Sequence, residues 1–115
     1  MNWLPLITEE QLTQINSLSQ QKDIAAVVIF KHSTRCSISS MALNRLERSW
    51  NLHEQSVPAY YLDLLNYRGI SNAIEKLYGI THQSPQILVI KNEKCIYSAT
   101  HSDISASELA EFINS

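Results

Sequence analysis

The chain is poor in cysteine, glycine and proline, with two cysteines, two glycines and three prolines among 115 residues. Two cysteines are too few for a disulfide scaffold, and no pair has the spacing of a zinc site. A strong charge of either sign is also missing, because 9 Lys and Arg face 11 Asp and Glu. A formal charge of −2 gives no electrostatic reason to expect nucleic acid or an anionic membrane surface as a partner.

Long apolar runs are absent as well. No window approaches the length of a membrane span, and the short apolar stretch at residues 2–7 has no basic segment before it, so no signal peptide is predicted. We therefore expect a cytoplasmic protein, where a thiol is usually free. With 44% hydrophobic residues, the chain is long enough for one real core, and residues 1–115 are predicted to form a single domain.

The hydrophobic pattern predicts eight elements in the order α-β-α-β-α-β-β-α. Strands are expected at residues 25–31, 59–65, 86–91 and 94–99, the last two joined by a tight turn at residues 92–93. Helices are expected from residue 8 to about 21, from Cys36 to Trp50, from about residue 69 to Gly79, and over residues 105–113. This order predicts an α/β fold with a four-stranded mixed sheet and helices on both faces, which is the plan of the thioredoxin-like fold.

Apolar residues at helical spacing predict which side of each helix is buried. In the helix after Cys36 the expected buried stripe is Ile38, Met41, Ala42, Leu46 and Trp50. The third helix carries Ile70, Ala73, Ile74 and Leu77. The closing helix is expected to dock on the sheet through Leu109, Phe112 and Ile113.

Cys36 lies where a buried strand runs directly into a helix. The unsatisfied N–H groups and the positive end of the helix dipole favour a thiolate there, and Arg35 adds a fixed positive charge. The next three residues, Ser37-Ile38-Ser39, contain no second cysteine, so this thiol cannot close a disulfide within its own turn. The pattern therefore predicts a single reactive cysteine.

The stretch from Lys31 to Ser39, together with Ser84-Pro85-Gln86 before a strand, resembles the monothiol bacilliredoxin family, whose members include proteins described as general stress proteins. The resemblance covers essentially the whole chain. It implies a thioredoxin-like fold in which Cys36 is the catalytic cysteine and Pro85 the cis-proline beside it. Thr34, Arg35, Ser84 and Pro85 are then expected to bind substrate. Ser37 stands where the family usually has a proline.

The resemblance also implies a function. Cys36 would remove a low-molecular-weight thiol, expected to be bacillithiol, from S-thiolated proteins, with the small thiol as co-substrate and no bound cofactor or metal. Two other functions stay open. A monothiol site of this kind can hold an iron–sulfur cluster between two chains, and the fold can also serve as a redox-inactive binding module.

Cys95 and the histidines have less specific interpretations. Cys95 could resolve an oxidised Cys36, but a small apolar residue in an outer strand is the favoured interpretation, and no Cys36–Cys95 disulfide is expected. His32 could be a proton donor or a ligand, and a polar residue at a strand end is the simpler reading. The remaining histidines make no recognisable metal set with either cysteine.

Overall fold

The computed structural model describes residues 2–33, 35–53 and 55–114, which form a sheet of five strands with helices on both faces. The elements follow along the chain as β1 (Trp3–Pro5), α1 (Glu10–Leu18), β2 (Val27–His32), α2 (Ser37–Arg48), β3 (Ala59–Asp63), α3 (Arg68–Tyr78), β4 (Gln86–Lys91), β5 (Lys94–Thr100), η1 (His101–Asp103) and α4 (Ala106–Asn114).

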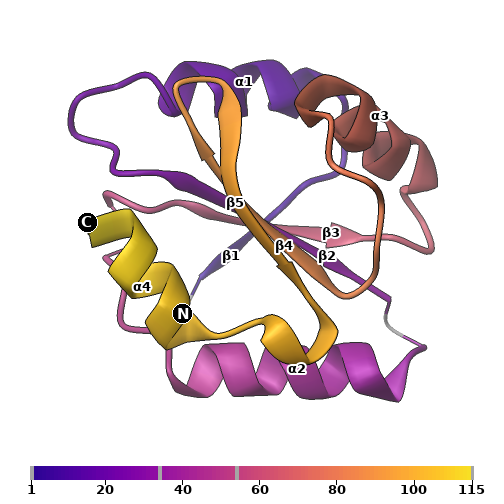
Figure 1. Cartoon of the computed structure of the whole chain (residues 1–115). Helices are drawn as coiled ribbons and strands as arrows, with labels where there is room; N and C mark the ends of the chain where they lie inside the picture. The colour runs from indigo at the N-terminus through magenta and orange to yellow at the C-terminus, as the bar shows by residue number, and fades with distance from the viewer. Residues whose placement is uncertain (1, 34, 54, 115) are drawn as a thin grey trace.

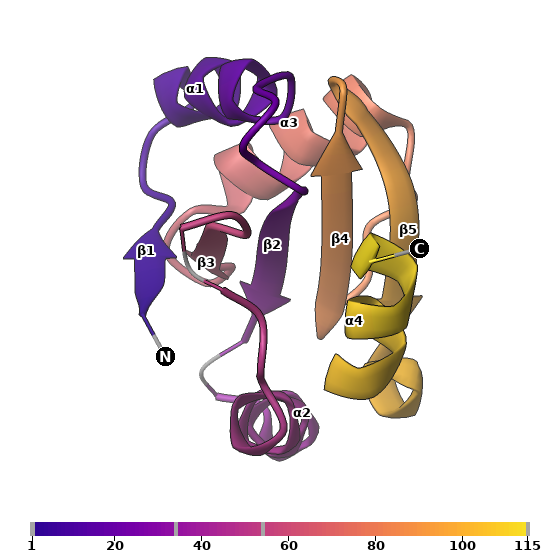
Figure 2. The same cartoon turned by 90° about the vertical axis from the view of Figure 1, so that its left-hand side faces the viewer.

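The strands lie in the order β1-β3-β2-β4-β5. The strands β1 and β2 are parallel to β3, whereas β4 is antiparallel to both β2 and β5. Helices α1 and α3 cover one face and α2 and α4 the other, as Figure 1 shows from one side and Figure 2 after a quarter turn. The predicted mixed sheet between two helical layers is confirmed.

Strand β2 is the centre of the molecule. All six of its residues are buried, as expected for a strand covered on both faces. Val28 and Phe30 pack into the core under α2 and α4, while Val27 and Ile29 pack into the core under α1 and α3. The single strand thus connects both cores, and its last residue leads into the loop before Cys36.

The strand predictions need one addition and small shifts. The sheet has a fifth strand, β1, which pairs with β3 from Trp3 opposite Ala59 to Pro5 opposite Tyr61. Three residues are too few for a periodic signal, and a proline is tolerated there because β1 is an edge strand. The other strands lie within two residues of the predicted ends. Asn92 and Glu93 have positive φ of 52° and 65°, which confirms the predicted tight turn between β4 and β5.

The predicted buried stripe of α2 is wrong at its beginning. Ile38 and Met41 are 58% and 65% exposed, and the buried residues are Ser39, Ala42 and Leu46. Ala42 and Leu46 are buried as predicted, but in the first turn the polar Ser39 turns inward and takes the position that the apolar pattern assigned to its neighbour Ile38.

One residue near the outer end of each of α3 and α4, Leu77 and Phe112, was also assigned to the core incorrectly, whereas Ile113 packs against the core as predicted. Leu77 is 48% exposed, although Ile70 and Ile74 are buried as predicted and Gly79 ends the helix in the left-handed conformation with φ 69°. In α4, Leu109 is fully buried, but Phe112 is 39% exposed and packs at the surface against Tyr97, with ring centroids 5.1 Å apart.

Candidate active site

Cys36 caps the N-terminus of α2. Its backbone is extended (φ −103°, ψ 120°), and its carbonyl accepts the N–H of Ser40 at 3.1 Å, which is the first bond of the helix. The Cys36 N–H donates to the carbonyl of Ser33 at 3.1 Å, so the loop from β2 closes tightly. The thiol is free, half-buried and makes no capping hydrogen bond of its own. The predicted position at a helix start is confirmed.

The neighbours of Cys36 are exposed. Arg35 directly precedes the cysteine at the surface, and Ser37 is the exposed first residue of α2. A proline at that first helical position would have no N–H, so Ser37 adds one backbone donor to the helix start beside the thiol. Thr34, the other predicted substrate residue of this loop, lies outside the described residues.

Ser39 and His32 form a buried pair beneath this loop. The Ser39 hydroxyl accepts the N–H of Ser33 at 3.1 Å and lies 2.7 Å from Nδ1 of His32. Burial lowers the pKa of the His32 imidazole, with Asp63 and Glu47 opposing this effect. The hydrogen bond between the Ser39 hydroxyl and Nδ1 of His32 joins the end of β2 to the first turn of α2. The sequence signal for this pair was a polar residue at helical spacing three positions after the cysteine.

Ser84 and Pro85 lie at the same end of the sheet as Cys36. The Ser84–Pro85 peptide bond is cis, as the resemblance implied. Gln86 pairs with Lys31 in the ladder between β4 and β2, so Pro85 flanks the strand end that leads to the cysteine. Among the described residues, the buried Ser84 hydroxyl has no hydrogen-bond partner. An unpaired buried hydroxyl is costly unless a ligand or water completes it.

Cys95 lies at the opposite end of the sheet from Cys36. It pairs with Ile90, which in turn pairs with Val27 at the start of β2. Cys36 follows the other end of β2, and the five-residue rise from Val27 to His32 alone spans about 16 Å. A disulfide needs Cα atoms within about 7 Å, so this structure holds the two thiols too far apart to bond. Burial also raises the pKa of the Cys95 thiol.

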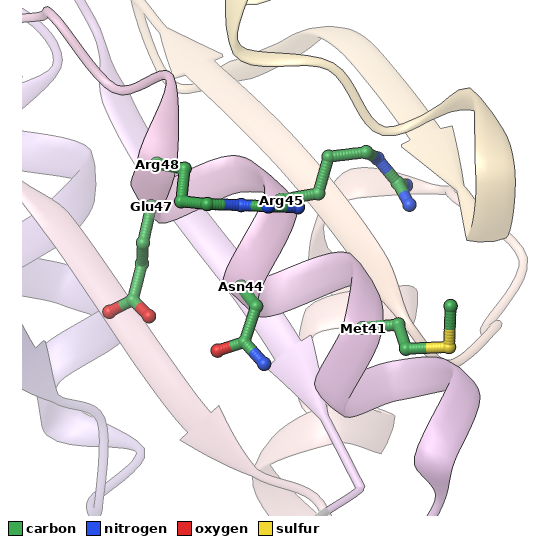
Figure 3. A pocket seen from close by; sticks show the side chains of 5 residues that line it. All are labelled: Met41, Asn44, Arg45, Glu47 and Arg48. Atoms are coloured by element: carbon green, nitrogen blue, oxygen red, sulfur yellow. The ribbon is translucent and has the colours of Figure 1, made fainter.

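A surface hollow of about 600 Å³ lies farther along α2 and is separate from these residues. Figure 3 shows its lining, which is Met41, Asn44, Arg45, Glu47 and Arg48. The guanidinium of Arg45 is already engaged, because it donates to the carbonyls of His101 and Ile104 at 3.0 and 3.1 Å. The hollow includes neither Cys36 nor Pro85, and we assign the candidate site to the thiol.

No group of three His, Cys, Asp or Glu side chains that could hold a metal ion is found in the described part of the chain. None of the helices described is long and apolar enough to cross a membrane.

Comparison with solved structures defines the fold of the protein. The chain is similar to the thioredoxin of Trypanosoma brucei brucei, with 16% identity, a TM-score of 0.74 and coverage of 99% of this chain and 93% of that one. It is similar to the thioredoxin of Malassezia sympodialis with 21% identity, a TM-score of 0.71 and coverage of 98% and 89%. The protein therefore has the thioredoxin fold.

A third structure, described as a candidate oxidoreductase with a thioredoxin fold, is 28% identical, has a TM-score of 0.78 and covers 97% of this chain and 93% of that one. Residues 5–109 match the family described as monothiol bacilliredoxin BrxC. The chain belongs to the monothiol bacilliredoxin family, as the motif around Cys36 indicated.

Proposed function

We propose that the protein is a monothiol thiol–disulfide oxidoreductase in which Cys36 removes a low-molecular-weight thiol, bacillithiol, from S-thiolated proteins in the cytoplasm. The observation that carries the proposal is the pair of residues at positions 36 and 39. A free thiol caps α2, and three residues later, where a Cys-x-x-Cys site would have its second thiol, a buried serine is held by His32 and Ser33.

The reaction consists of two thiol–disulfide exchanges. The Cys36 thiolate attacks the small-thiol sulfur of the mixed disulfide, the protein sulfur leaves as a thiolate, and Cys36 now carries the small thiol. A second small-thiol thiolate then attacks the small-thiol sulfur on Cys36, which releases the symmetrical small-thiol disulfide and restores the Cys36 thiolate. Each step exchanges one S–S bond for another, so the second small thiol is the only reductant required.

The surrounding residues support this chemistry. The helix N-terminus and the exposed charge of Arg35 would attract an anionic small thiol. The segment at Ser84 and Pro85 lies at the same end of the sheet as Cys36, and substrate backbone would lie along it beside the thiol. Thr34 is proposed to contact the same substrate.

The experiment uses a test protein with one cysteine held as a mixed disulfide with bacillithiol, and mass spectrometry of both proteins after mixing. The wild type should release the test protein and gain the mass of one bacillithiol at Cys36. Cys36→Ser should do neither. Cys95→Ser is the matched control, since it removes the other thiol, and it should behave as the wild type.

Two outcomes would contradict the proposal. Equal release by Cys36→Ser would show that this thiol does not perform the exchange. Loss of two hydrogens from the chain without an adduct, traced to a Cys36–Cys95 link, would replace the monothiol mechanism with a two-cysteine one. A parallel reaction with the glutathione mixed disulfide tests the choice of small thiol, because faster release from glutathione would exclude bacillithiol as the preferred partner.

A further inference from the structure

Two polar side chains are buried at the end of an otherwise apolar face of the sheet. Lys31 on β2 is 0% exposed and Gln86 on β4 is 2% exposed, and the two residues are directly opposite each other in the ladder. Because side chains alternate along a strand, both point to the face covered by α1 and α3, in line with Ile29 and Leu88 of that core. Burying an ammonium group there costs free energy that apolar residues would not cost.

Lys31 reaches across to α3 and to the segment that ends at Pro85, residues 81–85, which we name the proline loop. Its Nζ lies 3.4 Å from the carbonyl oxygen of Ser71 and 3.3 Å from Nδ1 of His82 in the proline loop. The Ser71 hydroxyl lies 3.0 Å from the same Nδ1. The ammonium group thus connects the central strand to both the first turns of α3 and the proline loop.

The side chain of Gln86, the residue that follows the proline loop, also holds this loop. Its side-chain Nε2 donates to the carbonyl of Thr81 at 3.0 Å, and its Oε1 accepts the N–H of Gln83 at 3.4 Å. The amide therefore closes the loop back on the start of β4. Together with Lys31, it ties the proline loop to the sheet at three positions.

The protonation states of Lys31 and His82 are consistent with the hydrogen bond between them. Burial lowers the pKa of Lys31 to about 8, although Glu75 of α3 opposes the shift. Burial also lowers the pKa of His82, helped by the charge of Lys31 and by Arg68 and opposed by Glu75. At pH 7 the lysine is charged and the imidazole neutral, so the ammonium donates to Nδ1 and His82 keeps its proton at Nε2, with the Ser71 hydroxyl also within hydrogen-bond distance of Nδ1.

We propose that Lys31 and Gln86 are positioning residues that hold the proline loop in the conformation in which it receives the disulfide substrate. The inference rests on the proposed function. It assigns to the buried lysine a role in substrate binding and none in the chemistry of Cys36, because the hydrogen bonds of Lys31 go to Ser71 and His82.

A positioning role and a merely structural role differ in what they do to stability. Replacing a buried charged group by an apolar one of similar shape is often neutral or stabilising. Lys31→Met should therefore keep or raise the midpoint of thermal unfolding while substrate binding is impaired. A residue present only for structure would lower the midpoint and affect substrate binding no more than any other destabilising change.

The experiment compares Lys31→Met with Lys91→Met as the matched control. Lys91 is also a strand lysine whose ammonium donates to backbone carbonyls, those of Gln21 and Ile24, but it lies at the other end of the sheet. Bacillithiol release from the test protein is measured against substrate concentration. The KM should rise roughly tenfold in Lys31→Met, as expected for a misplaced binding segment, and stay unchanged in Lys91→Met. The alkylation rate of Cys36 by iodoacetamide should be unchanged in both variants.

A second readout does not depend on activity. Nuclear magnetic resonance of the His82 ring and of the backbone amides of residues 81–83 should change in Lys31→Met and not in Lys91→Met, with the pKa of His82 raised by loss of the neighbouring positive charge. Gln86→Met should move the same amides and raise KM, which keeps the test available if Lys31→Met does not fold.

Two results would overturn the inference. The first is an unchanged KM in folded Lys31→Met and Gln86→Met, whatever the amides do. The second is a rise in KM accompanied by a clearly lowered unfolding midpoint in both variants, which would make these residues structural. If the wild type itself releases no small thiol, the proposed function fails. The ring and amide spectra then decide separately whether Lys31 and Gln86 hold the loop.

Discussion

Replacing Ser39 by alanine removes the hydroxyl that joins the end of β2 to the first turn of α2. Ser39 is 0% exposed, and its oxygen contacts Nδ1 of His32 at 2.7 Å and the N–H of Ser33 at 3.1 Å. The substitution leaves the buried imidazole nitrogen without its partner, a loss of about 1–3 kcal/mol. The half-buried Ser33 amide adds less, since water can reach it.

A smaller gain offsets this loss. Alanine favours the helix over serine by roughly 0.5 kcal/mol. The net expectation for Ser39→Ala is a decrease of about 2 kcal/mol in the free energy of unfolding. In a domain of this size 1 kcal/mol moves the unfolding midpoint by roughly 4 °C, so the midpoint should fall by about 8 °C.

The assay is thermal unfolding followed by far-ultraviolet circular dichroism at pH 7, with Ser40→Ala as the control. Ser40 is the next residue of the same helical turn, and its side chain makes no hydrogen bond within the described structure. Its replacement should change stability by less than about 0.5 kcal/mol. Hydrogen exchange at the Ser33 amide should become faster in Ser39→Ala only. Equal midpoints for the two variants would refute the reasoning that the Ser39 hydroxyl fastens the loop before Cys36.

Three other predictions follow from burial and charge. Leu109→Ala should cost about 2–5 kcal/mol, whereas Phe112→Ala at the partly exposed end of α4 should cost about 1–2 kcal/mol; similar denaturant midpoints would contradict the assigned packing of α4. Burial lowers the pKa of His32 and of His82, so the unfolded state binds protons more readily than the folded state below about pH 6.5. The free energy of unfolding should therefore fall as the pH falls from about 6.5 through the folded pKa values. A denaturant midpoint that does not fall from pH 7 to 5 would contradict the lowered pKa values. Burial lowers the pKa of Lys31 from 10.5 to about 8, so above pH 8 Lys31 is deprotonated in the folded state but still protonated in the unfolded state. The free energy of unfolding of the wild type therefore gains roughly 1.4 kcal/mol per pH unit between pH 8 and 10. The stability difference between wild type and Lys31→Met should therefore shift towards the wild type between pH 8 and 10, and a constant difference would contradict the assignment.

The central part of the fold can be predicted from the sequence because the local hydrophobic pattern there matches which residues are buried. The apolar run ending in β2, the tight turn at Asn92 and Glu93, and the glycine stop at Gly79 each follow from one short stretch of sequence. The helix start at Cys36 follows from the change of periodicity after a buried strand. The position of Pro85 beside it came from the family resemblance, since nothing in the residues alone indicates a cis bond.

The errors arise where the outcome depends on residues distant in sequence. The start of the buried face of α2 was misassigned because Ser39 is tolerated inside through the hydrogen bonds of its hydroxyl with His32 and Ser33, which lie outside the helix. Phe112 was assigned to the core because periodicity shows which side of a helix is apolar, while the depth of each residue depends on how α4 meets β5. The link from Lys31 to His82 was missed for a related reason, since it exists only once β4 pairs with β2.

Strand β2 ends in two consecutive residues, Lys31 and His32, that point to opposite faces of the sheet. One fastens the proline loop and the other fastens the turn that carries Cys36. The distance between the thiol and the proline loop is therefore set by one buried strand in the middle of the molecule and not by the loops themselves. The Cys36 turn and the proline loop are both attached to β2, so they can move at the surface and still keep their alignment. A one-residue slip of β2 would turn Lys31 and His32 to the opposite faces of the sheet and so remove the attachment of the proline loop and of the Cys36 turn together.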